Sequence, residues 1–207
     1  MSLRTFINTL ALALPLALSL ASAETGEEPL ANHALPRAPK IGFGVQLGMN
    51  GIAGIAGVTG TFYPLDNVAV DLGLGVGATG FTSGLRARGF FLESRHVHPY
   101  AGLGFRHGSG TGNTPATMEF TKGSGADTTT TKFEATIEAS NFADAQAGIE
   151  FRWGAFQLRP VLGWSQRLGG RNWNVVSGEA PDAESSDAMD VILGSGPTIA
   201  VETGFAF

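Results

Sequence analysis

The chain has 207 residues, no cysteine and a formal net charge of −5 at pH 7. This length suits one domain, and the lack of cysteine excludes disulfides, thiolate metal sites and cysteine nucleophiles. The acidic balance and the absence of a basic patch argue against nucleic-acid binding. Glycine is about twice as frequent as usual, at 30 residues, and charged residues make up only 15% of the chain.

The first residues predict export. Arg4 precedes an apolar run, residues 10–20, that is too short to span a bilayer, and Ala21-Ser22-Ala23 is a small-x-small cleavage site. We therefore predict a signal peptide over residues 1–23; the alternative is an N-terminal membrane anchor. Residues 24–39 are polar and contain proline, which predicts a periplasmic linker before a domain that covers residues 40–207. No later segment is long and apolar enough to predict a transmembrane helix.

From residue 40 onward, apolar residues alternate with small or charged ones, which predicts β-strands. Taken in chain order, the predicted strands cover residues 41–49, 54–63, 68–78, 84–92, 99–107, 142–153 and 156–168, and an eighth runs to residue 207. An even number of strands returns both ends of the domain to the same side.

The connections between these strands alternate in length. Those at 64–67, 93–98 and 154–155 are short, whereas two on the opposite end, 108–141 and 169–190, are long and polar; 50–53 and 79–83 lie on the long side but are brief. Short turns on one end and longer loops on the other are typical of outer-membrane barrels.

One hairpin predicts its own register. Gly154-Ala155 suits a two-residue type II′ turn, which places Trp153 opposite Phe156. The same register places Phe151 opposite Leu158, Ile149 opposite Pro160 and Glu150 opposite Arg159, so apolar meets apolar and acid meets base. Because proline cannot donate to a strand ladder, we predict a local bulge at Pro160.

The faces opposite the apolar ones carry glycine, alanine and a few charges of both signs. Such a mixture suits a narrow barrel interior better than a water-facing surface, so we predict that the apolar faces contact lipid. Since hydrocarbon tolerates no open sheet edge, the first strand must pair with the last. The predicted fold is all-β, a closed antiparallel eight-stranded transmembrane β-barrel. Its predicted lumen polar network is Asp71, Arg86, Arg88, Arg106, Asp144, Glu150, Arg152, Arg159 and Glu202.

Aromatic residues cluster near the short turns and the termini. These predict an aromatic girdle at one membrane interface. They are Phe62, Tyr63, Phe91, Tyr100, Trp153, Phe156, Phe205 and Phe207.

The chain ends in "TIAVETGFAF", with apolar residues at alternate positions; "GTFYPLDNVAVDLGLGVG" (60–77) and "HPYAGLGFRHG" (98–108) read as hairpin segments. Over residues 41–207 the sequence resembles the small eight-stranded outer-membrane β-barrel proteins, the group of the OmpA transmembrane domain and the opacity-like porins. The resemblance implies that the barrel assembly machinery reads Phe207, Phe205, Val201 and Ile199, with Thr203 a mild departure. It also implies a cell outer membrane of Gram-negative type, with lipid and lipopolysaccharide as partners.

We predict a non-enzymatic structural or surface-interaction role for the long loops, with no catalytic residue, metal or cofactor. One alternative is a narrow porin-like channel, although side chains nearly fill an eight-stranded barrel. Another is a lipid A-modifying enzyme. His107 and Ser109 are two residues apart, with Glu119 further on, and this resembles the His and Ser of outer-membrane lipid A deacylases, although here the pair ends the fifth predicted strand and does not lie late in the chain. The last is a soluble periplasmic barrel of lipocalin type, which conflicts with arginines on the glycine face.

Three further motifs carry weaker hypotheses. "GVGATG" (75–80) matches the dinucleotide-binding pattern, but no helical sequence follows it. His96 and His98 alone are too few to predict a metal site. The threonine-rich stretch at 126–136 is either an adhesive edge or a mobile loop.

Overall fold

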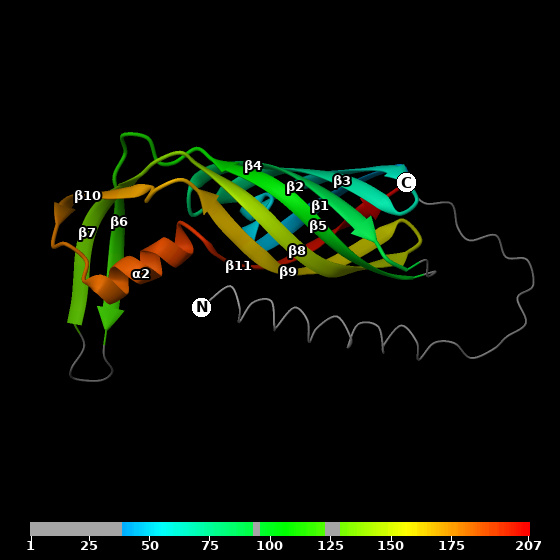
Figure 1. Cartoon of the computed structure of the whole chain (residues 1–207). Coiled ribbons are helices and arrows are strands. Elements are labelled where there is room, and N and C mark those ends of the chain that lie inside the picture. The colour runs from blue at the N-terminus through cyan, green and yellow to red at the C-terminus, as the bar shows by residue number, and fades with distance from the viewer. Residues whose placement is uncertain (1–38, 93–95, 123–128) are drawn as a thin grey trace, which may run out of the picture. The chain divides into compact units, whose positions relative to one another are not determined.

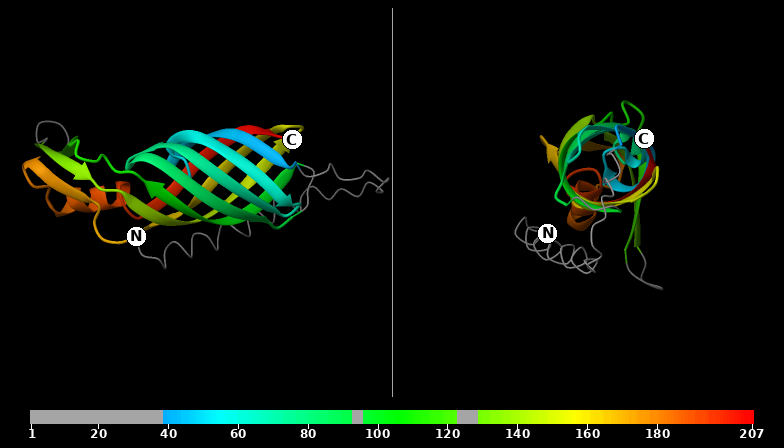
Figure 2. Two further views of the ribbon diagram at one scale, coloured as in Figure 1. Left: turned by 90° about the horizontal axis from the view of Figure 1, so that it is seen from above. Right: turned by 90° about the vertical axis from the view of Figure 1, so that its right-hand side faces the viewer.

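The computed structural model describes residues 39–92, 96–122 and 129–207 (Figure 1). The predicted signal peptide and residues 24–38 of the predicted linker lie outside this part of the chain. Within it, eight strands form a closed antiparallel barrel in the order β1-β11-β9-β8-β5-β4-β3-β2, which confirms the predicted all-β, closed eight-stranded architecture (Figure 2). The barrel strands are β1 (Ile41–Gly51), β2 (Gly54–Leu65), β3 (Val68–Gly77), β4 (Gly80–Phe90), β5 (Val97–Gly108), β8 (Ser140–Trp153), β9 (Phe156–Leu168) and β11 (Gly196–Ala206).

The first and last strands close the barrel, as predicted. β1 pairs with β11 from Gly42 opposite Ala206 to Met49 opposite Ile199. At the end of this seam the backbone N–H groups of Lys40 and Ile41 donate to the carbonyl oxygen of Phe207 at 2.6 and 3.1 Å. The backbone groups of both edge strands are thus paired, as a hydrocarbon environment demands.

The β8–β9 hairpin has the predicted register. Trp153 lies opposite Phe156 and Phe151 opposite Leu158, and Gly154 has the positive φ, 62°, that a type II′ turn needs at its first central position. The predicted bulge at Pro160 is wrong. The register is the same on both sides of this residue, and Pro160 pairs with Val201 of β11.

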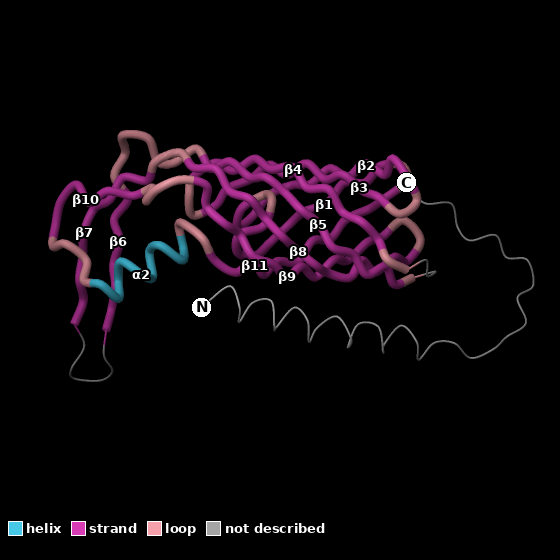
Figure 3. The backbone as a smooth tube through the Cα atoms, viewed as in Figure 1, coloured by secondary structure: helices cyan, strands magenta, loops and turns pink. Residues whose placement is uncertain are grey.

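The two long connections are not simple loops, which corrects the sequence-based prediction. They form β6 (Ala116–Lys122), β7 (Thr129–Ile137), β10 (Trp173–Gly178) and helix α2 (Ala183–Ile192). The strands make a separate sheet in the order β10-β7-β6, beyond one end of the barrel (Figure 3). We call this sheet and α2 the external module. The structure contains no helix, within its described ranges, that is long and apolar enough to cross a membrane.

The turn between β1 and β2 folds into the lumen. Ile52 and Ala53 are completely buried there. Gln46 holds the turn, since its Nε2 donates to the Gly54 carbonyl at 3.1 Å and its Oε1 accepts from the Ala53 N–H at 3.4 Å. On the facing wall, a Cβ atom at Gly73 would lie 2.8 Å from the Ile52 carbonyl carbon, and one at Gly84 would lie 2.5 Å from the Ile52 oxygen. Two of the lumen glycines therefore make room for this turn.

Replacing Gly84 by valine should expel the turn and destabilise the barrel. The added side chain meets Ile52 backbone, so we expect a loss of about 1–3 kcal/mol in the free energy of unfolding, as for other overpacked sites. Gly89→Val is the matched control, because Gly89 lies on the same strand and has nothing within 4 Å of its Cβ position. Urea unfolding of both variants in detergent micelles measures the difference. Equal stability of the two would contradict the inward turn.

Candidate functional site

The barrel reverses the usual distribution of polar and apolar side chains. Its outward face carries highly exposed apolar residues, among them Leu103 at 72%, Phe43 at 65% and Leu72 at 62%. The inward face carries the charges: Asp71, Glu150 and Glu202 are completely buried, and Arg86 and Arg88 are 1% exposed. The predicted lumen residues all lie on this inward face, and most of them meet in one network.

Asp71 is the centre of the network. Its Oδ2 accepts hydrogen bonds from Nε of Arg86 at 2.8 Å and from Nε of Arg88 at 2.7 Å. Its Oδ1 accepts from the Thr61 hydroxyl at 2.7 Å and from Arg159 Nη1 at 3.3 Å. Both carboxylate oxygens are therefore saturated, which is the condition under which a buried charge is tolerated.

Two further carboxylates connect these arginines across the lumen. Glu202 on β11 accepts from Arg86 Nη2 at 2.9 Å and lies 3.1 Å from Arg159 Nη2. Glu150 on β8 accepts from Arg88 Nη1 at 2.7 Å and also pairs with Arg152. The network thus joins strands that are far apart around the barrel wall.

Arg106 and Asp144 form a separate, looser pair. The shortest ion-pair distance between them is 3.9 Å, from Arg106 Nε to Asp144 Oδ2. The guanidinium instead donates to the Ser165 hydroxyl at 2.9 Å and lies over the Phe142 ring, 4.1 Å from its centroid. The structure therefore brings seven of the nine predicted lumen residues together and leaves these two apart.

Neutral polar residues, which the predicted network leaves out, complete the lumen. Gln146 accepts from Arg86 Nη1 at 2.7 Å, and Gln157 Nε2 donates to the Tyr63 hydroxyl at 2.9 Å. Each residue lies on the same alternating face as the predicted charges, so its position in the strand alternation could have identified it as a lumen residue.

The same parity corrects the predicted aromatic girdle. Tyr63 and Tyr100 point inward and are 5% and 1% exposed. There they take part in the lumen network: the Tyr63 hydroxyl lies 3.4 Å from both Glu150 oxygens, and Arg88 lies 4.9 Å from the Tyr100 ring centroid. The remaining aromatic residues of the predicted girdle are exposed: Phe62, Phe91, Trp153, Phe156, Phe205 and Phe207.

Removing the central carboxylate should be costly. Asp71→Ala leaves buried arginines without their partner, so we expect a loss of about 3–5 kcal/mol in the free energy of unfolding. The matched control is Glu119→Ala, which breaks the exposed Glu119–Lys132 pair at 3.1 Å and should cost about 0–1 kcal/mol. Urea titrations of the folded proteins in micelles compare them. A similar, small loss in both would show that the lumen network contributes little.

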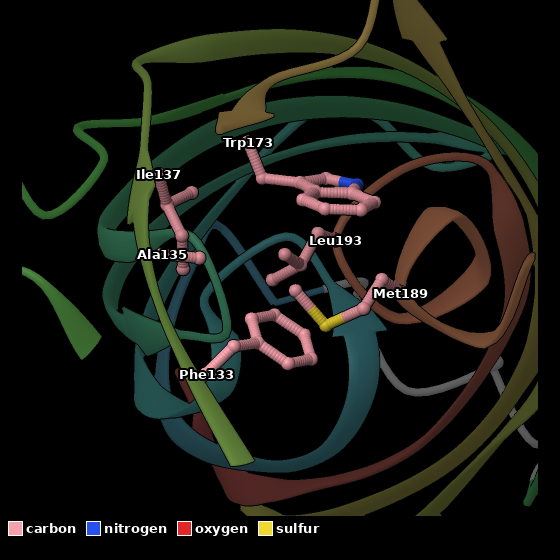
Figure 4. Close-up of a cluster of buried hydrophobic side chains, with 6 residues drawn as sticks. All are labelled: Phe133, Ala135, Ile137, Trp173, Met189 and Leu193. Carbon is pink, nitrogen blue, oxygen red and sulfur yellow. The ribbon is translucent and has the colours of Figure 1, made fainter. Parts of the chain in front are cut away.

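The external module has its own hydrophobic core. Phe133, Ala135 and Ile137 point from β7 toward Met189 and Leu193, and the Trp173 indole of β10 lies against them (Figure 4). Ala78, in the turn between β3 and β4, packs on the same cluster. The module is therefore a folded unit in contact with the rim of the barrel.

Asp190 ties α2 to β10. Its Oδ1 accepts from Trp173 Nε1 at 3.0 Å, and its Oδ2 accepts from Arg171 Nη2 at 3.1 Å. Partial burial favours the uncharged carboxyl, but the hydrogen bonds from Trp173 and Arg171 outweigh it and lower the pKa of Asp190 below its ordinary value of 3.8.

This lowered pKa predicts an acid-sensitive module. A carboxyl whose folded pKa is depressed contributes stability above its unfolded pKa and loses it as the pH falls through the folded value. With the barrel residues Trp153 and Trp164 replaced by phenylalanine, the fluorescence of Trp173 follows the module alone, and we expect its thermal unfolding to shift downward as the pH falls below about 4. Asp190→Asn, which does not titrate, should show a smaller shift. Identical pH profiles for the two proteins would exclude this role of Asp190.

His107 and Ser109, the two residues of the hypothetical catalytic pair, contact other groups in the structure. His107 Nδ1 lies 2.9 Å from Asn141 Oδ1, whereas the Ser109 hydroxyl accepts from the Phe81 N–H, so the pair makes no contact suited to nucleophile activation. Glu119, the acid of that hypothesis, pairs with Lys132 in the external module.

The surroundings of the dinucleotide-binding motif and of the histidine pair support neither a nucleotide site nor a metal site. The glycines at 75–80 belong to β3, a turn and β4, with no helix after them. His98 packs edge-on against Phe90, and His96 Nδ1 lies 3.0 Å from the Arg152 carbonyl. Within residues 39–92, 96–122 and 129–207, no group of three His, Cys, Asp or Glu side chains is placed to hold a metal.

The described part of the threonine-rich stretch does not form the edge of a sheet. Residues 129–137 form β7, the middle strand of the external sheet, and residues 126–128 lie outside the described part. Comparison of the chain with protein-family models, with curated proteins and with solved structures finds no match.

Proposed function

We propose that this protein is an outer-membrane β-barrel of a Gram-negative-type envelope that displays the external module at the cell surface in a non-enzymatic, structural or surface-interaction role. One observation carries the proposal: an exposed apolar face surrounds a barrel whose interior holds buried ion pairs. In water this arrangement would expose apolar surface on every side of the barrel. In a bilayer it places the apolar belt in hydrocarbon.

The dimensions support the same conclusion. The barrel strands have 10 to 14 residues. At about 3.3 Å per residue and a tilt of about 40°, a strand of ten residues covers roughly 25 Å of hydrocarbon. The exposed aromatic residues Phe62, Trp153, Phe156 and Phe205 lie at the end with the short turns, as expected for an interfacial girdle.

The lumen favours a structural role over the alternative of a narrow channel. The Asp71 network crosses the interior with buried side chains, and the β1–β2 turn places Ile52 above it. A solute would have to displace both. The enzyme alternative lacks a His–Ser contact, since His107 bonds to Asn141.

The resemblance to the OmpA and opacity-like group adds the finer part of the proposal. Phe207, Phe205, Val201 and Ile199 are exposed on the outward face of the closing strand, where the assembly machinery can read them. Export by the predicted signal peptide, contact with outer-membrane lipid and lipopolysaccharide, and insertion by that machinery follow from the same proposal.

Surface labelling tests the proposal. An epitope tag after Gly112, an exposed residue at the module end, should stain on intact cells. The same tag after Asp66, in the exposed β2–β3 turn at the opposite end, should stain only after permeabilisation. The tagged proteins should fractionate with the outer membrane and migrate differently on gels before and after boiling. A soluble periplasmic protein without a heat shift would overturn the proposal.

A further inference from the structure

The external sheet has two outer strands with different edges. β10 is irregular, because its register with β7 shifts between Val175 and Ser177. β6 pairs regularly with β7 over its whole length, from Ala116 opposite Ala135 to Lys122 opposite Thr129. A bulge protects a sheet edge from further pairing, whereas a regular edge strand is a template for another strand. Among the strands that the structure describes, β6 is therefore the edge of the external sheet that suits strand addition.

The helix-facing side of β6 is incompletely covered. Met118 and Phe120 are half-buried against the module core, and Phe120 stacks on Phe133 with ring centroids 6.0 Å apart. Apolar side chains of an added strand would lie beside Met118 and Phe120 and cover their exposed parts. The core of the module would then extend by one strand.

The opposite side of β6 is polar and acidic. Thr117, Glu119 and Thr121 are exposed there, and Glu134 on β7 shares this face. Lys132 provides one positive charge and pairs with Glu119 at 3.1 Å. A basic side chain on an added strand would lie across from Glu119 and form a favourable cross-strand pair.

A second copy of this chain fits the edge less well. Antiparallel pairing of two β6 strands over all their residues would place Glu119 opposite Glu119. Like charges directly opposite each other destabilise a strand pair. The charge pattern thus favours a different polypeptide as the occupant.

We propose that the β6 edge binds an extended polypeptide segment whose residues alternate between apolar and basic, added as a fourth strand of the external sheet. Backbone hydrogen bonds would provide affinity, while the Met118–Phe120 side and the Glu119 side would provide specificity. This inference rests on the proposed function, because it assigns the surface interaction to one edge of the module.

Peptide binding to the full-length protein in detergent micelles tests the inference. The probe is a fluorescent, capped peptide of about nine residues that alternates valine and lysine, and the control peptide alternates valine and glutamate. Fluorescence anisotropy should show binding of the valine–lysine peptide. The valine–glutamate peptide should bind at least about tenfold more weakly, because it faces Glu119 with like charge.

Two lysine substitutions separate the edges. Met118→Lys places an inward-pointing charge on the β6 edge and should weaken binding about tenfold, whereas Val176→Lys, on the β10 edge, adds the same charge and should leave binding unchanged. Glu119→Lys is a third variant, and it should reverse the preference between the two peptides. With Trp153 and Trp164 replaced by phenylalanine, the fluorescence of Trp173 verifies that each module is folded.

Three results would overturn the inference: no binding of the valine–lysine peptide, equal weakening by Met118→Lys and Val176→Lys, or a dimer in sedimentation of the free protein that Met118→Lys abolishes. A negative peptide result together with correct surface labelling of the Gly112 tag would remove only this inference. Failure of the surface labelling would remove the proposed function, whatever the peptides do.

Discussion

The ion pairs centred on Asp71 determine which face of every contributing strand points inward. A buried charge is tolerated only when its partners saturate it, and Asp71 achieves this with Arg86, Arg88 and Arg159. A slip of one residue in any of these strands would turn its charged side chain toward the outer face. The lumen charges can therefore pair only in the observed strand register. In that register the apolar side chains of the same strands point outward and form the apolar belt.

Space inside the barrel is the second constraint. The arginines of the Asp71 network fill the half of the lumen near the short turns, and the inward β1–β2 turn and Arg106 fill part of the other half. The turn fits because Gly73 and Gly84, which are paired on β3 and β4, leave backbone room for Ile52. This filled interior supports a role for the barrel as a support for the external module rather than as a conduit. On the proposed function, the module, which has its own core around Phe133 and Trp173, is the part that the barrel displays.

Strand alternation made the barrel predictable from the sequence. Runs such as Val68, Val70, Leu72 gave strand positions, and the two-residue turn at Gly154 gave a register that the structure repeats. Tyr63 and Tyr100 were assigned to the girdle because they are aromatic, although parity places them inside with the charges they contact. Pro160 needs no bulge, since a strand can keep its register while losing one donor.

The external module was harder to predict for a physical reason. Its sheet is short and mostly polar, so Phe133, Ala135 and Ile137 alternate within a threonine-rich stretch whose composition resembles a loop. The partners that bury them, Trp173 and Met189, lie in the other long connection. The inward turn was likewise hidden, because the contact of Gly84 with Ile52 exists only once the barrel closes.

Site-directed spin labelling in lipid vesicles can establish which face of the barrel contacts lipid, because the chain has no cysteine of its own. Single cysteines at Leu162, Ile199 and Leu103, each labelled with a nitroxide, sample the outward face, and one at Val161, 1% exposed, samples the lumen. If the apolar face of the barrel contacts lipid, the three outward labels respond to oxygen dissolved in the bilayer and not to a water-soluble relaxation agent, while the Val161 label responds to neither. Outward labels that the water-soluble agent reaches freely would contradict the lipid-facing barrel.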